Sequence, residues 1–361
     1  MLFSVHNPWK ILYWRERVEK LLRGEMPDPI VFTIDPSNKC NLSCEWCFTQ
    51  DYIRENPYVL DAGLMHSLID ELAGTELQSI ALCGGGEPLA NPETPNAIRH
   101  IAETGKKVGL ITNGTLLTDD AISAVLKCCD YIRISVDAAE SETWIALHHG
   151  DECSWRNLVR GITSLAEQRQ GKRPTIGISF LVCPFNYRQI TDAAAYFKRL
   201  GADYMALKMT LTDYPSLRHL GYSGKAFFEE KNAELWEIFR EAERLADTEF
   251  RVVYRHPGMF IKNEIKRPGH YYKKCRATPL GVSGITADGT FYCCCDRRDS
   301  LHFGRYGIEG SFRELWSGRR HFEALNSINL NECPDRCCAQ ETNEIIERAF
   351  VNGELEWPWT A

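Results

Sequence analysis

The pattern that most limits the possible folds of this chain is a regular alternation of short apolar runs with longer amphipathic segments. The runs are rich in β-branched residues, and the segments between them have the length and apolar spacing of helices. Six runs follow one another: Ile30–Ile34, Ser79–Cys83, Val108–Thr112, Tyr131–Val136, Thr175–Val182 and Tyr204–Met209. Repeated β-then-α units predict a parallel sheet. Because eight such units close a full barrel, six predict an α/β fold with a partial (β/α)6 TIM-like barrel.

The composition changes along the chain and predicts three parts. Residues 1–29 have apolar positions at helical spacing and predict a leading helix. Residues 30–255 contain the six units and a connecting helix, and residues 256–361 are rich in cysteine and turn residues. We expect this last part to be a small α+β domain after the barrel.

Charge and hydropathy exclude several kinds of partner. A formal charge of −7 lacks the basic footprint that nucleic acids or acidic membranes require. The N-terminus mixes tryptophan with lysine and arginine and lacks the apolar core of a signal peptide. No stretch reaches the ~18 apolar residues of a spanning helix. We therefore expect a cytoplasmic protein.

Cysteine is unusually frequent, with fifteen residues. A reducing compartment disfavours disulfides, so metal binding becomes the leading interpretation. One group lies near the start of the chain and another near its end: Cys40, Cys44 and Cys47, then Cys275, Cys293, Cys294, Cys295, Cys333, Cys337 and Cys338. Two separate metal sites are predicted.

The first group has the spacing CxxxCxxC directly after the first expected strand. Three thiolates can hold three irons of a 4Fe-4S cluster and leave the fourth iron open for a ligand. A structural zinc site or unpaired buried thiols are the alternatives. The motif resembles the signature of the radical S-adenosylmethionine (radical SAM) superfamily, with Trp46 at the usual aromatic position.

That resemblance implies the chemistry of the family. The open iron chelates the amino and carboxylate groups of S-adenosylmethionine, and the cluster donates an electron that cleaves the sulfonium. A 5′-deoxyadenosyl radical results. The resemblance also implies flavodoxin or ferredoxin as the reductant.

Polar groups after the next strands add to the resemblance. Gly85, Gly86 and Glu87 resemble the GGEP motif that binds the methionine amino group, although a Gly-rich segment before proline is also an ordinary tight turn. Asn113 and Ser135 correspond to positions that contact the ribose or carboxylate of the cofactor. Asn-Gly is also a common turn, and Asp137, beside Ser135, could cap the next segment.

Two residues on the last expected strands are candidates for substrate chemistry. Lys208 stands in an apolar strand, where it needs a partner or a polar cavity, so it meets an anionic group in the barrel or lies at a wet strand end. Cys183 ends the fifth strand. It is a candidate hydrogen-atom donor, as in related epimerases, and the alternative is a buried packing thiol.

The second cysteine group resembles the SPASM and shorter twitch extensions, which bind auxiliary iron-sulfur clusters. Thirteen residues separate Cys275 from Gly289 and four separate Gly289 from Cys294, and Asp288-Gly289 predicts a hairpin turn. The CxxC that precedes the closing CxxxC of a full SPASM domain is missing, so the resemblance implies one auxiliary cluster. Its expected ligands are Cys275, Cys294, Cys333 and Cys337. The adjacent Cys293, Cys295 and Cys338 leave this choice open, and a zinc ribbon is the alternative.

The substrate class follows from the resemblance and from chain length. Only 29 residues precede the first strand, too few for a leader-recognition domain of peptide-modifying relatives. We therefore expect oxidation, epimerisation or elimination on a small polar metabolite such as a sugar, cyclitol, nucleoside or aminoglycoside. The alternative enzyme is a peptide or protein maturase, including one that forms formylglycine or crosslinks a peptide. A zinc-binding or electron-carrying scaffold is the non-catalytic alternative.

Overall fold

The computed structural model describes residues 8–209, 221, 224–254, 271–333 and 337–354. The expected boundary between residues 255 and 256 falls within residues 255–270, which lie outside the described part, as do residues 1–7 of the expected leading segment.

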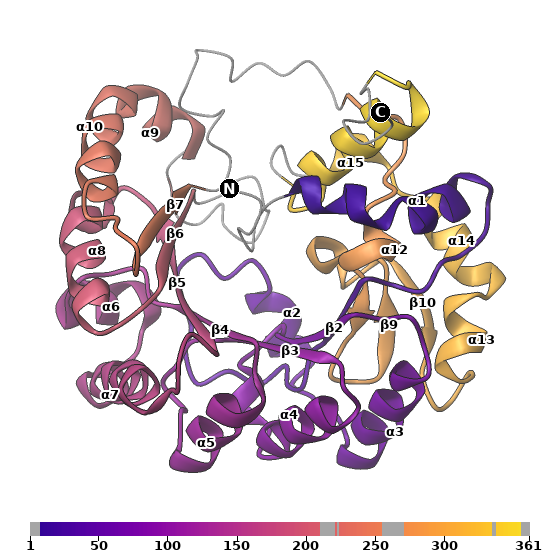
Figure 1. Ribbon diagram of the computed structural model, residues 1–361, viewed down its shortest axis with the longest axis horizontal. Coiled ribbons are helices and arrows are strands. Elements are labelled where there is room, and N and C mark those ends of the chain that lie inside the picture. Colours follow the sequence, from indigo (N-terminus) through magenta and orange to yellow (C-terminus); the bar gives the residue numbers. More distant parts are fainter. Residues whose placement is uncertain (1–7, 210–220, 222–223, 255–270, 334–336, 355–361) are drawn as a thin grey trace.

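One curved sheet of ten strands forms the framework, in the order β10-β9-β8-β1-β2-β3-β4-β5-β6-β7. The six predicted strands are confirmed as β1 to β6: Val31–Ile34, Ser79–Leu82, Lys107–Thr112, Tyr131–Ser135, Thr175–Val182 and Tyr204–Met209. They pair in parallel and in chain order. All their carboxyl ends therefore lie at one rim, where such folds carry their chemistry. The sheet closes only part of a barrel (Figure 1).

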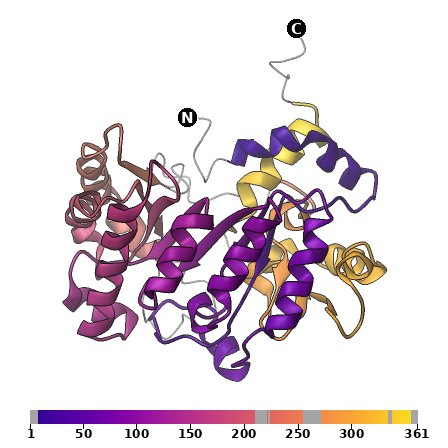
Figure 2. The ribbon, with the colours of Figure 1, turned by 60° about the horizontal axis from the view of Figure 1, so that its bottom comes forward.

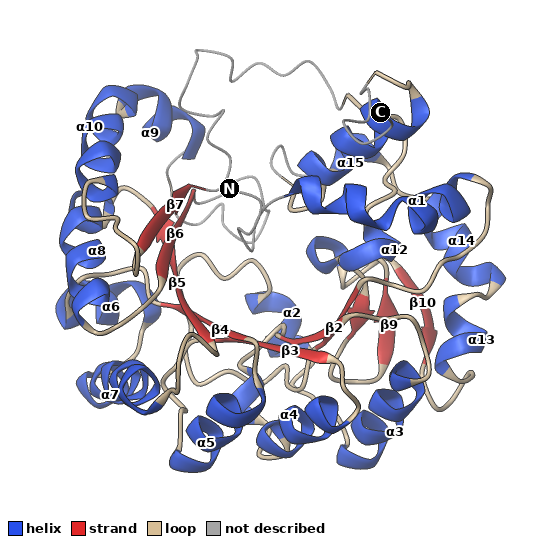
Figure 3. Ribbon diagram, in the orientation of Figure 1, coloured by secondary structure: helices blue, strands red, loops and turns tan. Residues whose placement is uncertain are grey.

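Helices cover the outer face of this arc, with the strands lining its inside (Figure 3). They are α3 to α8, with bounds Ala62–Ala73, Thr94–Glu103, Asp119–Cys128, Ser141–His148, Glu152–Gln168 and Ile190–Arg199. Side-chain caps fix several starts: Asp61, Thr118 and Asp151 accept backbone N–H groups of α3, α5 and α7. The sequence pattern missed α6, whose hydrophobic face is weak.

The sheet extends beyond the six predicted strands at both ends. After α9 (Gly224–Glu230) and α10 (Asn232–Glu243), β7 (Arg251–Tyr254) adds a seventh parallel strand. On the other side of β1, β8 (Gly284–Ile285) pairs in parallel with it and continues into the antiparallel β9 (Thr290–Tyr292) and β10 (His302–Arg305). The predicted hairpin turn is confirmed: Gly289 has φ +88°, a conformation that glycine accepts without strain.

The two ends of the described chain lie together beside this C-terminal part of the sheet (Figures 1 and 2). The leading segment forms a 3-10 helix, Pro8–Trp14, followed by α1, Arg15–Leu22. Val18 packs with Leu280 of α12 (Thr278–Gly281) and with Ile346 of α15 (Gln340–Ile346). In chain order, α13 (Phe312–Trp316) and α14 (Arg319–Asn326) follow α12 and precede α15. None of the described helices is long and apolar enough to cross a membrane.

Candidate functional site

A pocket of about 410 Å³ opens at the carboxyl rim of the parallel strands. Its wall includes the loop after β1, the glycine turn after β2 and the ends of β3 to β6. The pocket brings together most residues that the sequence singled out: Cys40, Cys44, Trp46, Cys47, Gly85, Gly86, Glu87, Asn113, Ser135 and Lys208. Cys183 instead packs, fully buried, beside Trp46 and Leu147.

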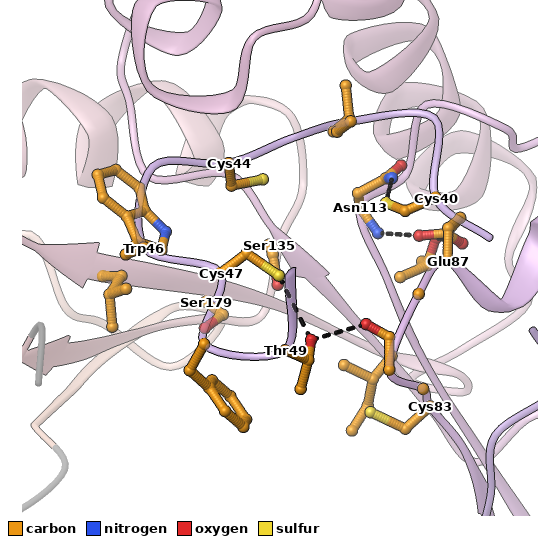
Figure 4. Close-up of a pocket in the computed structure, with 18 of the residues that line it drawn as sticks. Cys40, Cys44, Trp46, Cys47, Thr49, Cys83, Glu87, Asn113, Ser135 and Ser179 are labelled. Carbon is orange, nitrogen blue, oxygen red and sulfur yellow. Dashed lines mark hydrogen bonds between the residues drawn. The ribbon is translucent and has the colours of Figure 1, made fainter. Parts of the chain in front are cut away.

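Cys40, Cys44 and Cys47 surround one open space in the pocket (Figure 4). All three are free thiols. Burial, with the nearby charges of Glu87 and the other two cysteines, raises the pKa of Cys40 to about 12. Cys40 is exposed and the other two are partly buried. Three neighbouring thiolates repel one another, and bound iron would offset that repulsion while displacing the protons. The residues present therefore fit an iron-sulfur cluster with three cysteine ligands.

The glycine turn packs directly against the cysteine loop. A Cβ atom on Gly86 would lie 2.4 Å from the carbonyl oxygen of Lys39 and 2.6 Å from that of Asn38. Thr49 joins the two segments, because its Oγ1 donates to the carbonyl oxygen of Gly85 at 2.9 Å and lies 3.4 Å from Cys47 Sγ (Figure 4). Only glycine permits this close approach of two backbones.

Glu87 anchors the turn to β3 while lining the pocket. Its carboxylate accepts the Thr112 hydroxyl at 2.6 Å, the Asn113 N–H at 2.7 Å and the Leu89 N–H at 3.0 Å. Burial raises the pKa of this carboxyl, and the three hydrogen bonds oppose that rise. Both oxygens thus already have partners within the chain, a role that the motif alone did not indicate.

Polar side chains continue around the rim. Asn113 Nδ2 donates to Asn41 Oδ1 at 3.0 Å and lies 4.0 Å from Cys40 Sγ. Ser135 stands in register with Ser179 on β5, and both line the pocket. The sequence reading missed Ser179, since one serine within an apolar run gives no signal of its own.

His148 is a further residue that the motifs did not reveal. It is 2% exposed and stacks on Trp144. Its Nδ1 lies 3.0 Å from Cys44 Sγ, and its Nε2 lies 2.9 Å from the Val136 carbonyl oxygen and 3.2 Å from Asp137 Oδ2. Burial lowers the pKa of His148, but the charges and hydrogen bonds of Cys44 and Asp137 outweigh burial and raise it to about 10. The cysteine loop is thereby tied to α6.

The cysteines of the second group lie near one another in the C-terminal part of the fold. Burial and the charges of Cys275 and Cys294 raise the pKa of Cys333 to about 11. Asn343 Nδ2 donates to Cys275 Sγ at 3.3 Å, and the Ala339 N–H donates to Cys337 Sγ at 3.3 Å. Backbone and amide donors to sulfur are the usual surroundings of cysteine-bound metal, so these residues fit a cluster or a zinc ion.

A buried ion pair joins the two cysteine regions. Arg298 Nη1 donates to Asp35 Oδ2 at 2.8 Å, and Arg298 Nε donates to the Cys295 carbonyl oxygen at 3.0 Å. Asp35 directly follows β1 and is fully buried. Burial raises its pKa, and the Arg298 guanidinium opposes that rise. The loop after β9 is therefore fastened to the first barrel strand.

Comparison with known proteins gives a consistent result. Residues 34–197 match the model of the radical SAM superfamily. The tungsten-containing aldehyde ferredoxin oxidoreductase cofactor-modifying protein of Pyrococcus furiosus is 27% identical over 233 residues. That match covers 63% of this chain and 61% of that protein, so it spans less than two thirds of its length.

Two further proteins match over most of the chain. GTP 3′,8-cyclase 1 of Mycobacterium tuberculosis is 27% identical over 327 residues, which are 88% of this chain and 80% of that protein. The crystal structure of Streptococcus suis SuiB bound to precursor peptide SuiA superposes with a TM-score of 0.66 at 17% identity, over 90% of this chain and 73% of that one. The likeness to SuiB shows the fold.

Proposed function

We propose that this chain is a peptide-modifying enzyme of the radical SAM superfamily, whose model matches residues 34–197, and that it binds a 4Fe-4S cluster and S-adenosylmethionine in this pocket. The main observation in favour of radical chemistry is that three free thiols, the glycine turn and the strand ends line one pocket. When bound, the cluster and S-adenosylmethionine supply one-electron sulfonium cleavage and hydrogen-atom abstraction from the substrate.

The chain's own residues bind and orient these groups. Cys40, Cys44 and Cys47 would hold the cluster. The backbone of Gly85 and Gly86, kept in place by Glu87 and Thr49, offers polar groups to the methionine end of S-adenosylmethionine. Asn113, Ser135 and Ser179 present hydrogen-bonding groups for its ribose and carboxylate. Lys208, on the β6 wall, would bind an anionic group of the substrate.

The C-terminal cysteines complete the proposed cofactor set. We assign one auxiliary 4Fe-4S cluster to Cys275, Cys294, Cys333 and Cys337, which would accept an electron from the substrate radical. With two cubes, the chain would hold about eight irons. A flavodoxin or ferredoxin is the proposed reductant, and the abundance of free cysteines supports a cytoplasmic setting.

The peptide substrate is supported by the solved relative. SuiB, whose fold covers 90% of this chain, was crystallised with its precursor peptide. A small metabolite is the second candidate, and the GTP 3′,8-cyclase match over 88% of the chain favours it. A nucleotide could place its phosphates near Lys208 in the pocket wall.

The first experiment tests radical chemistry. The protein is reconstituted anaerobically with iron and sulfide and reduced, and 5′-deoxyadenosine is quantified by mass spectrometry. We expect product from the natural chain and from Cys153→Ala, which alters an exposed cysteine outside the pocket. Cys40→Ala, Cys44→Ala and Cys47→Ala should each form none. Product from any of these three, or none from the natural chain, would refute the proposal.

The second experiment separates the substrate classes. Short peptides encoded beside the gene, and nucleotides, are each deuterated and added to the reduced enzyme. A peptide substrate predicts faster 5′-deoxyadenosine formation and deuterium transfer into that product only in the peptide arm. Transfer only from nucleotides would replace the peptide proposal with the metabolite one.

A further inference from the structure

Two cysteines and an aspartate remain when the two proposed clusters have received their ligands. Cys295 Sγ lies 3.6 Å from Cys338 Sγ and 3.8 Å from Asp296 Oδ1. One ligand atom from each of the three residues falls within 4.8 Å of the others. Asp296 and Cys338 also line the pocket that contains Cys40, Cys44 and Cys47. This group therefore stands at the wall of the reaction pocket.

The spacing of the sulfurs fits one metal ion. Two Zn–S bonds of about 2.3 Å that meet near the tetrahedral angle place the sulfurs about 3.8 Å apart. The observed 3.6 Å agrees with that span. A disulfide would hold the sulfurs about 2 Å apart. In a 4Fe-4S cluster each cysteine sulfur binds a different iron and points away from the centre of the cluster. Two ligand sulfurs of one cluster are therefore much farther apart than 3.6 Å.

The charges around these residues favour a cation. Arg298, whose Nε donates to the Cys295 carbonyl oxygen, forms an ion pair with Asp35. Two thiolates and a carboxylate this close together, each of them only partly buried, repel one another, and a bound divalent ion would offset that repulsion.

We propose that Cys295, Asp296 and Cys338 form a mononuclear site for zinc, a thiophilic divalent ion, at the wall of the pocket. Three protein ligands leave the fourth tetrahedral position for water or for a substrate group, as in catalytic rather than structural zinc sites. At this wall the ion would anchor a thiolate, imidazole or carboxylate group of the substrate. The site is independent of the substrate class proposed above.

The test measures metals and their ligands in the full-length, anaerobically reconstituted protein. We expect about one zinc per chain beside the iron, with an X-ray absorption shell of two sulfurs at about 2.3 Å and lighter atoms completing the coordination. Cys295→Ser and Cys338→Ser should lower zinc occupancy at least about tenfold at equal free zinc and leave iron unchanged. Asp296→Asn conserves side-chain size and should also weaken zinc binding. Cys153→Ser is the matched control with unaltered zinc.

Three results would overturn the site. Loss of about four irons per chain in Cys338→Ser would make this cysteine a cluster ligand. A shell of four sulfurs would place the zinc among Cys275, Cys294, Cys333 and Cys337. Equal zinc in the natural chain and all three variants would mean that these residues do not bind it. None of these measurements depends on 5′-deoxyadenosine formation. Failure of the zinc site can therefore be told apart from failure of the proposed function.

Discussion

Substituting His321 should remove an acid-dependent loss of stability from the C-terminal part of the fold. This side chain of α14 is fully buried and stacks on Phe303 with ring centroids 3.9 Å apart. Its Nδ1 lies 2.7 Å from the Trp316 carbonyl oxygen and donates to it. Burial lowers the pKa of His321 from 6.5 to about 4, although the hydrogen bond to Trp316 opposes this shift.

The sign and size of the effect follow from the two pKa values. The folded state keeps the imidazole neutral down to about pH 4, whereas the unfolded chain takes up a proton near pH 6.5. The stability contributed by the neutral form is full above pH 6.5 and is lost as the pH falls toward 4. At pH 5 the loss is about 2 kcal/mol. With about 2.1 cal/mol/K of unfolding entropy per residue and 361 residues, this corresponds to about 3 °C in Tm.

His321→Asn tests this directly, because the amide can replace the Nδ1 donor and does not titrate. The lost ring stacking lowers Tm equally at every pH. Thermal unfolding of the cluster-loaded protein is followed by circular dichroism at pH 8 and pH 5. We expect the natural chain to lose about 3 °C more than the variant between these values. Parallel losses in the two proteins would show that His321 does not carry the effect.

Two other substitutions test contacts around the pocket. Gly86→Ala places a methyl group 2.4 Å from the Lys39 carbonyl oxygen, so we expect S-adenosylmethionine binding in equilibrium dialysis to weaken at least about tenfold. Gly74→Ala, whose nearest contact is 3.5 Å away, is its control and should bind normally. Arg298→Met leaves Asp35 buried without its cation and should destabilise the fold by about 3–5 kcal/mol in anaerobic denaturation. The double variant with Asp35→Leu should recover most of this loss, and no recovery would contradict the pairing.

The sequence predicted what depends on local pattern. Six strands were placed within about two residues, the usual uncertainty of element ends, because their β-branched runs are bounded by clear helices. The spacing of Cys40, Cys44 and Cys47 pointed to residues that line one pocket, and Asp288-Gly289 predicted the hairpin. Each of these patterns involves only a few neighbouring residues, so it can be recognised in the sequence without knowledge of the tertiary structure.

Contacts between distant segments had no such signal. His148 is 104 residues from Cys44, and Arg298 is 263 residues from Asp35. Neither residue stands in a motif, so only the fold brings the partners together. The four-residue strand β7 was missed for a related reason, because so short a run after polar helices carries too little pattern to be distinguished from a loop.

The pairing of β8 with β1 has a consequence for how this chain can be divided. A chain cut before residue 271 would lose β8 and leave the backbone groups along one side of β1 without partners. An uncovered strand side of this kind recruits strands of other molecules and promotes aggregation. The cysteine-rich end therefore belongs to the same sheet as the barrel strands, and we expect a chain that ends before β8 to aggregate.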